Sequence, residues 1–296
     1  MRILNPGLLR SRAAGGEIEV NALSVCGPVR DENQDAAAAW RGKRGEAVLI
    51  IADGMGGHSS GRQAAEIVVR VALDTLRQGP GRGCADWEAV LRRAFAAAQE
   101  AVHAAAKGPA HQAGGTSGMG ATAVMAVVAG SGVGSSSDGQ LLHVAHAGDS
   151  RAYLYRGRSL IRLTTDHSMV EQMVRDGLLR EDEAFGHPDS NVIQRAIGQD
   201  APLEPEVQPP VPLDAGDLVL LSTDGLHGVV HDAEIAAVVE SSGSTVEICR
   251  NLLQAALAAA SQDNITIGCM RPSVGGTRRR TTRIEAAPPV PEGEVP

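Results

Sequence analysis

Five aspartates stand where an apolar run of the sequence begins or ends: Asp35, Asp53, Asp149, Asp224 and Asp263. Two of them, Asp53 and Asp224, follow such a run and precede a glycine. For any single position the simplest interpretation is a turn, because an aspartate can bond to its own backbone and glycine tolerates positive φ. That interpretation is weaker when all five positions are considered together.

Clustered aspartates would have a specific chemistry. Carboxylates that lie close together repel and raise one another's pKa, so they destabilise a fold unless cations neutralise them. Mg²⁺ and Mn²⁺ favour such oxygen ligands. Two ions about 3.5–4 Å apart can hold a water and lower its pKa from about 15.7 toward about 7. The five aspartates therefore indicate a two-metal centre that activates water near neutral pH.

The elements that must position these aspartates are short strands and longer helices. Strand patterns cover 17–25, 35–40, 47–52, 122–128, 141–147, 151–155, 218–222 and 265–270. Helical periodicity covers 61–76, 86–106, 170–176, 232–240 and 245–259. Many of the strands are joined closely enough for antiparallel pairing. This order predicts an α+β architecture with helices outside packed sheets.

Composition excludes several classes of protein. Hydrophobic residues make up 43% and charged residues 21% of the 296 residues, which argues against a wholly disordered chain. The formal net charge of −8 argues against nucleic acid as a partner, because phosphate backbones require clustered cations. No apolar run approaches the roughly 20 residues that span a bilayer, so we expect no membrane partner. Four cysteines without zinc-ligand spacing are typical of reduced thiols in a cytoplasmic protein.

The chain is expected to form one domain between two tails. Residues 1–16 contain proline and glycine without periodicity and predict a flexible N-terminal tail. Residues 272–296 are rich in proline and charge and predict a disordered C-terminal tail. Between them, 17–271 contains no internal repeat and no long linker, and the Gly/Ser stretch 130–139 is typical of a hairpin loop.

Six motifs, five of which contain one of the aspartates, occur in this order: RDENQD (30–35), ADGMGGH (52–58), GTSGMGAT (115–122), AGDSR (147–151), STDGL (222–226) and DNIT (263–266). Together they resemble the motifs of the PPM-type metal-dependent protein serine/threonine phosphatases, the protein phosphatase 2C family. The resemblance covers about residues 17–271. The bacterial branch is the closer likeness, because TDHS (165–168) and the residues after it resemble its flap subdomain, at about 165–195.

The resemblance implies a fold and a metal-ligand set. The fold would be a four-layer α-β-β-α sandwich, two antiparallel β-sheets flanked by helices, with the metals at one end of the sheet pair. Asp53 would bridge two metals, and the carbonyl of Gly54 would join one of them. Asp224 and Asp263 would complete the protein ligands of the first metal. Asp35 would serve the second metal, directly or through water.

Three further roles are implied. Asp149 matches the residue that holds a third, weaker metal in several relatives. Arg30 matches the residue that clamps the substrate phosphate, and its planar guanidinium suits two phosphate oxygens. Asn264 would orient Asp263 as an outer hydrogen-bond partner.

The sequence departs from the family pattern at three places. Met55 stands where relatives often carry a histidine proposed to protonate the leaving alcohol, which would leave that step to water or to His58. Gln34 replaces a glutamate of other members, which makes Asp35 the better candidate ligand. Gly228 stands where many relatives carry Asp or Asn beside the third metal.

The implied activity is hydrolysis of phosphoserine and phosphothreonine on proteins by a hydroxide held by two ions, Mn²⁺ or Mg²⁺. The implied partners are phosphorylated proteins, including a serine/threonine kinase that the enzyme opposes or its substrates, and we expect a monomer. Two alternatives remain open: a phosphoprotein-binding protein without turnover, and an enzyme for small phosphate esters. Retention of the aspartates favours catalysis over the first alternative.

Overall fold

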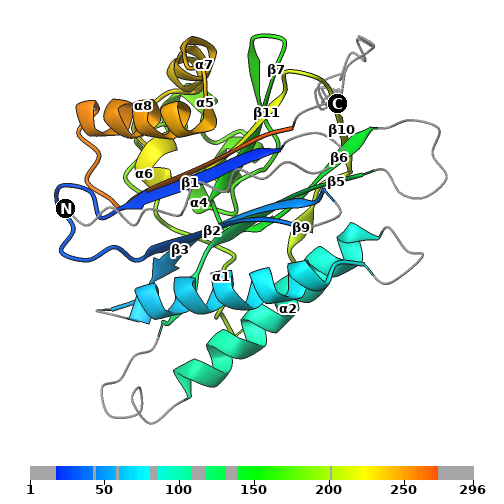
Figure 1. Ribbon diagram of the computed structural model, residues 1–296. Coiled ribbons are helices and arrows are strands. Elements are labelled where there is room, and N and C mark those ends of the chain that lie inside the picture. The colour runs from blue at the N-terminus through cyan, green and yellow to red at the C-terminus, as the bar shows by residue number, and fades with distance from the viewer. Residues whose placement is uncertain are drawn as a thin grey trace, which may run out of the picture.

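Two antiparallel sheets lie face to face, with helices on both outer faces (Figure 1). The computed structural model describes residues 18–42, 45–57, 60–80, 86–107, 118–130, 139–200 and 202–272. The predicted N-terminal tail, the C-terminal tail from 273 onward, most of the Gly/Ser stretch and His58 lie outside the described residues. The expected α-β-β-α sandwich is confirmed.

The first sheet has five strands. Their order is β1 (Glu19–Val25), β12 (Ile265–Arg271), β11 (Leu218–Ser222), β7 (Arg151–Arg156) and β8 (Ser159–Arg162). Two helices cover its outer face, α7 (Asp232–Ser241) and α8 (Thr245–Ala258) (Figure 1). Their apolar sides pack on Tyr153, Leu220 and Ile267 of this sheet.

The second sheet is built around four long strands and several short ones. Its order is β10 (Val211–Leu213), β6 (Gln140–Ala147), β5 (Ala123–Gly130), β3 (Ala47–Met55) and β2 (Asp35–Arg41); β4 (Gly120–Ala121) pairs with β3, and β9 (Glu206–Val207) pairs with β6. Helices α1 (Ser60–Gln78) and α2 (Trp87–Ala106) cover the outer face of this sheet (Figure 1).

Strand β3 is apolar on both faces because it lies between two cores. Its side chains alternate across the sheet, so Val48 and Ile50 pack toward α1 and α2, whereas Leu49 and Ile51 pack between the two sheets. A Cβ atom on Gly268 of β12 would lie 2.8 Å from a terminal carbon of Leu49. Glycine at this position therefore allows the two sheets to approach closely.

The helices begin where capping residues allow. Helix α2 starts after Asp86, whose carboxylate accepts a hydrogen bond from the backbone N–H of Ala89 at 2.9 Å. Helix α4 (Met169–Arg175) starts in the same way after Ser168. The short helices α5 (Glu181–Ala184) and α6 (Asp224–His227) are too short to give a periodic signal in the sequence. Within the described residues, no helix combines the length and apolar character needed to cross a bilayer.

The structure differs from the sequence prediction at the strand ends near the aspartates. The prediction ended one strand at residue 52, but β3 continues through Met55. Asp53 pairs with Asp35 of β2, while Gly54 and Met55 pair with β4. The neighbouring strands thus keep the Asp-Gly dipeptide extended instead of letting it form a turn. Similarly, Thr122 separates β4 from β5 and does not open a strand.

Candidate metal centre

The five aspartates come together at one end of the sheet pair. Asp35 opens β2 and lies opposite Asp53 in β3. Asp149 follows β6, Asp224 follows β11, and Asp263 stands two residues before β12. Because neighbouring strands run antiparallel, the start of one lies beside the end of the next. The carboxylates are close enough for their charges to shift one another's pKa values.

The environment of these carboxylates disfavours negative charge. Burial raises the pKa of Asp35 to about 7 and that of Asp224 to about 6, and neighbouring carboxylates add to both shifts. Burial also raises the pKa values of Asp53 and Asp149 well above the ordinary value. The charges of Asp35 and Asp224 raise the pKa of Asp53 further, and the charge of Asp224 raises that of Asp149. Four acidic groups with raised pKa values form a site that a cation would stabilise.

The residues fit divalent ions. The Oδ1 atom of Asp224 is buried and has no hydrogen-bond partner within the described part of the chain. Burying a carboxylate oxygen without a hydrogen-bond donor costs free energy, because the oxygen loses its bound water, unless a positively charged group takes the place of that water. A set made only of carboxylates and a backbone carbonyl matches the hard oxygen ligands that Mg²⁺ and Mn²⁺ prefer.

Two threonines that the sequence analysis did not identify hold Asp35. The hydroxyl of Thr223 donates to Asp35 Oδ2 at 3.0 Å, and the hydroxyl of Thr266 donates to the same oxygen at 2.6 Å. The hydroxyl of Thr223 also accepts the backbone N–H of Thr266 at 3.0 Å. Both threonines lie within the motifs STDGL (222–226) and DNIT (263–266), next to candidate ligands in the sequence. That position in the motifs was the only sequence feature that could have identified them. These bonds leave the second oxygen of Asp35 for another partner.

Arg30 lies at the exposed edge of the cluster. Its guanidinium donates to Asp263 Oδ2 at 2.8 Å, and 55% of its side chain is exposed. Asp263 is also partly exposed. A planar guanidinium beside a carboxylate cluster and open to solvent can meet an incoming anion with two N–H groups. The structure therefore brings Arg30 together with the aspartates.

Asn264 acts differently from the prediction. Its backbone N–H, and not its side chain, donates to Asp263 Oδ1 at 2.8 Å. The side-chain amide donates to the carbonyls of Cys26 and Glu32, and its oxygen accepts the backbone N–H of Gln34 at 2.8 Å. The side chain of Asn264 thus fixes the segment between β1 and β2, which carries Arg30.

The three departures from the family pattern lie around the cluster. Met55 ends β3 and is partly buried. The backbone carbonyl of Gln34 accepts the N–H of Gly54 at 3.2 Å. Gly228 closes α6 through a hydrogen bond from its N–H to the carbonyl of Asp224 at 2.7 Å. Having no side chain, Gly228 offers the cluster no further ligand beyond its backbone.

Comparisons with known proteins agree with this geometry. The family model described as protein phosphatase 2C matches residues 30–260. The protein phosphatase PhpP of Streptococcus pneumoniae is 31% identical over 259 residues, which cover 84% of this chain and 96% of that protein.

Solved structures resemble the whole fold. The serine/threonine phosphatase Stp1 from Staphylococcus aureus aligns with a TM-score of 0.76 at 29% identity, covering 90% of this chain and 99% of that one. The catalytic domain of the serine threonine protein phosphatase PstP, solved in complex with two manganese ions, aligns with a TM-score of 0.69 at 28% identity, covering 86% and 98% of the two chains. This chain therefore belongs to the protein phosphatase 2C family and is a phosphoprotein phosphatase.

Proposed function

We propose that this enzyme hydrolyses phosphoserine and phosphothreonine in proteins with two Mn²⁺ or Mg²⁺ ions, and that it opposes a serine/threonine kinase. The observation that carries the proposal is the cluster of carboxylates whose pKa values are raised, in which the buried Oδ1 of Asp224 has no hydrogen-bond partner among the described residues. The two manganese ions bound to PstP support the choice of metal and the number of ions.

The family resemblance implies the ligand roles that we propose. Asp53 would be a ligand shared by both ions, and the carbonyl of Gly54, the next residue of β3, would be a ligand of one of them. Asp224 and Asp263 would bind the first ion from the other sheet. Asp35, which receives both threonine hydroxyls on Oδ2, would serve the second ion directly or through water. Asp149 would hold a third ion.

The ions, when bound, would supply an activated water and neutralise charge on the phosphoryl group. The protein itself would orient the substrate. Arg30 would turn from Asp263 toward the phosphate and bind two of its oxygens, and Asp263 would keep the guanidinium within reach. Met55 cannot donate a proton, so the leaving serine or threonine oxygen would take its proton from water or from His58.

Phosphate release from a phosphothreonine peptide tests this function. The purified protein would be assayed with Mn²⁺, with Mg²⁺ and with a chelator, and Asp224→Asn would serve as the control for contaminating phosphatases. We expect metal-dependent release that the variant abolishes without unfolding. Release that persists in Asp224→Asn would refute the proposed centre.

The same assay separates the two alternatives. A protein that binds the phosphopeptide with no release under any metal would be a phosphoprotein-binding protein. Faster hydrolysis of free phosphothreonine than of the peptide would indicate an enzyme for small phosphate esters. The cytoplasmic location, the monomeric state and the domain limits 17–271 remain predictions.

A further inference from the structure

We propose that His167 is a positioning residue that holds the Gly148–Asp149 turn, and through it the Asp149 carboxylate, in place at the metal centre. The proposal rests on the proposed function, because Asp149 has a role there only if the cluster binds metal. It assigns a task to a buried histidine cluster that lies beside the carboxylates and that the mechanism above does not use.

His167 binds both polar groups of the Gly148 backbone. Its own backbone N–H donates to the carbonyl of Gly148 at 3.0 Å. Its ring Nδ1 accepts the backbone N–H of Gly148 at 3.1 Å. Gly148 has a φ of +107°, which side chains rarely allow, and a Cβ there would overlap Thr122. The backbone turn before Asp149 thus depends on glycine at position 148 and on the two hydrogen bonds that His167 makes to it.

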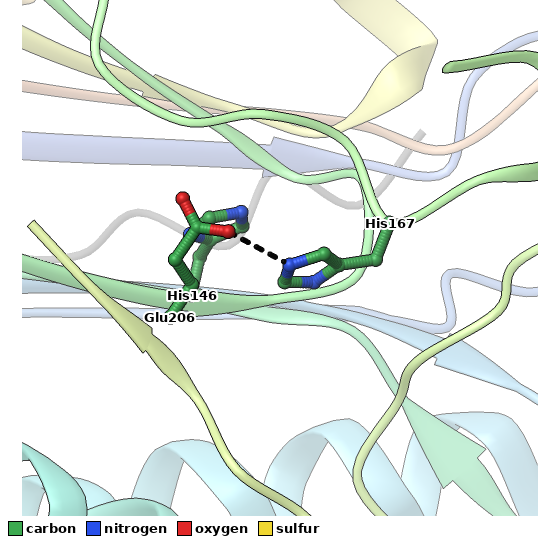
Figure 2. A group of neighbouring side chains, drawn as sticks. All are labelled: His146, His167 and Glu206. Carbon is green, nitrogen blue, oxygen red and sulfur yellow. Dashed lines mark hydrogen bonds and ion pairs between the residues drawn. The ribbon is translucent and has the colours of Figure 1, made fainter. Parts of the chain in front are cut away.

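The ring of His167 is itself held rigidly. It stacks on His146 with ring centroids 4.5 Å apart and an angle of 5° between the planes. Because Nδ1 accepts a hydrogen bond, the proton of the neutral ring lies on Nε2, which faces Glu206 Oε2 at 3.2 Å (Figure 2). The Nε2–H of His146 donates to the carbonyl of Thr165 at 2.7 Å, which fixes the segment leading to His167.

The surroundings keep this ring neutral. His167 is only 6% exposed. Burial, together with the neighbouring His146 and Arg195, lowers the pKa of His167 to about 4. The Nδ1 lone pair is therefore available to the Gly148 N–H at neutral pH.

A metal ion bound by the histidine cluster is the competing explanation. Ligand atoms of His146, His167 and Glu206 lie within 4.8 Å of one another, and the buried Nδ1 of His146 has no hydrogen-bond partner within the described residues. However, ring nitrogens donate in the ring plane, and two parallel stacked rings do not aim at a common point. The guanidinium of Arg195 also lies 3.2 Å from His167 Nε2, where an ion would have to bind. The geometry favours positioning over ligation.

Two variants separate the contacts of His167. His167→Asn places an amide oxygen near the position of Nδ1 and can still accept the Gly148 N–H. His167→Gln places its amide near Nε2, so it keeps the contact with Glu206 and loses the contact with Gly148. We expect the asparagine variant to bind Mn²⁺ as the original protein does, within about twofold, and the glutamine variant to bind its weakest ion about tenfold less tightly.

Mn²⁺ binding would be measured on the full chain by calorimetry and by electron paramagnetic resonance, without substrate. Melting temperatures of the metal-free variants would show whether either is merely unfolded. Equal Mn²⁺ binding in both variants, or equal weakening in both, would overturn the proposal. The proposal would also be overturned if the original protein bound Zn²⁺ tightly and both variants lost that binding. This result would show that His146, His167 and Glu206 form a metal site.

A measurement on the original protein needs no variant. An N–H···N hydrogen bond transmits a ¹⁵N–¹⁵N scalar coupling, which we expect between the Gly148 amide and His167 Nδ1; its absence would refute the contact. If the original protein neither binds Mn²⁺ nor releases phosphate, the proposed function fails. If it does both and the glutamine variant matches it, only the role of His167 fails.

Discussion

The affinity of the carboxylate cluster for Mn²⁺ should rise steeply with pH. Metal ions bind carboxylates in their ionised form, so binding must displace protons from groups whose pKa is raised. Asp35 has a pKa of about 7 and Asp224 a pKa of about 6. Between pH 6 and pH 8 both groups therefore pass from mostly or partly protonated to ionised.

The magnitude follows from these two values. At pH 6 about one tenth of Asp35 and about half of Asp224 are ionised, whereas at pH 8 about nine tenths or more of each are ionised. The ionised fraction thus rises about tenfold for Asp35 and about twofold for Asp224 between pH 6 and pH 8. Because both must be ionised to bind the metal, the Mn²⁺ affinity should rise by the product, about 20-fold, which corresponds to about 1.8 kcal/mol. The raised pKa values of Asp53 and Asp149 act in the same direction.

Isothermal titration calorimetry at pH 6 and pH 8 tests this prediction. Repeating each titration in buffers with different ionisation enthalpies gives the number of protons released per ion. Asp74→Asn, which removes an exposed carboxylate of α1 outside the cluster, is the matched control and should leave the pH dependence unchanged. An affinity change below about twofold without proton release would refute the argument that these ligands are protonated in the free protein.

Three further outcomes follow from the same contacts. The pKa of Asp35 is higher in the folded protein than its ordinary value of 3.8, so its contribution to the stability of the metal-free protein should be full below about pH 4 and should be lost as pH rises toward 7. Melting curves with chelator would measure this as a difference between the original protein and Asp35→Asn that changes with pH, and a constant difference would contradict it. Thr266→Val removes a donor to Asp35, raises its pKa further and should weaken Mn²⁺ binding at pH 7 by about fivefold, whereas Thr266→Ser should restore it in the same titration. Asp217→Ala leaves the guanidinium of Arg156 without its buried partner, so the free energy of unfolding measured with urea should fall by about 3–5 kcal/mol. The Mn²⁺ affinity should stay unchanged, and a shifted affinity would show that this ion pair acts on the carboxylate cluster.

The family resemblance predicted the four layers of the fold, and the pattern of strands and helices in the sequence is consistent with them. The run Val48–Ile51 is apolar at every position because β3 packs against helices on one face and against a sheet on the other. Periodic apolar residues located α1 and α2 to within two residues of their ends. The aspartates could be selected because each stands at the beginning or the end of an apolar run, and the family resemblance supplied their roles.

The contacts that hold the site could not be predicted in the same way. The hydroxyls of Thr223 and Thr266 reach Asp35 across 188 and 231 residues of sequence, and such pairs depend on how the two sheets pack. His167 and Gly148 belong to different segments and carry no shared periodic signal. The sequence analysis predicts that the side chain of Asn264 bonds to the adjacent Asp263, but it donates to the carbonyls of Cys26 and Glu32, more than 200 residues away in the sequence.

The close approach of the sheets at Gly268 and Leu49 has an evolutionary consequence. Asp35 and Asp53 belong to one sheet, whereas Asp224 and Asp263 flank strands of the other, so the thickness of the apolar layer sets the distance between the two halves of the proposed ligand set. Mg²⁺ demands near-ideal octahedral geometry, and larger ions tolerate more distortion. If these aspartates hold the ions as proposed, exchanging methyl groups in the apolar layer would change the metal preference while every ligand stays the same.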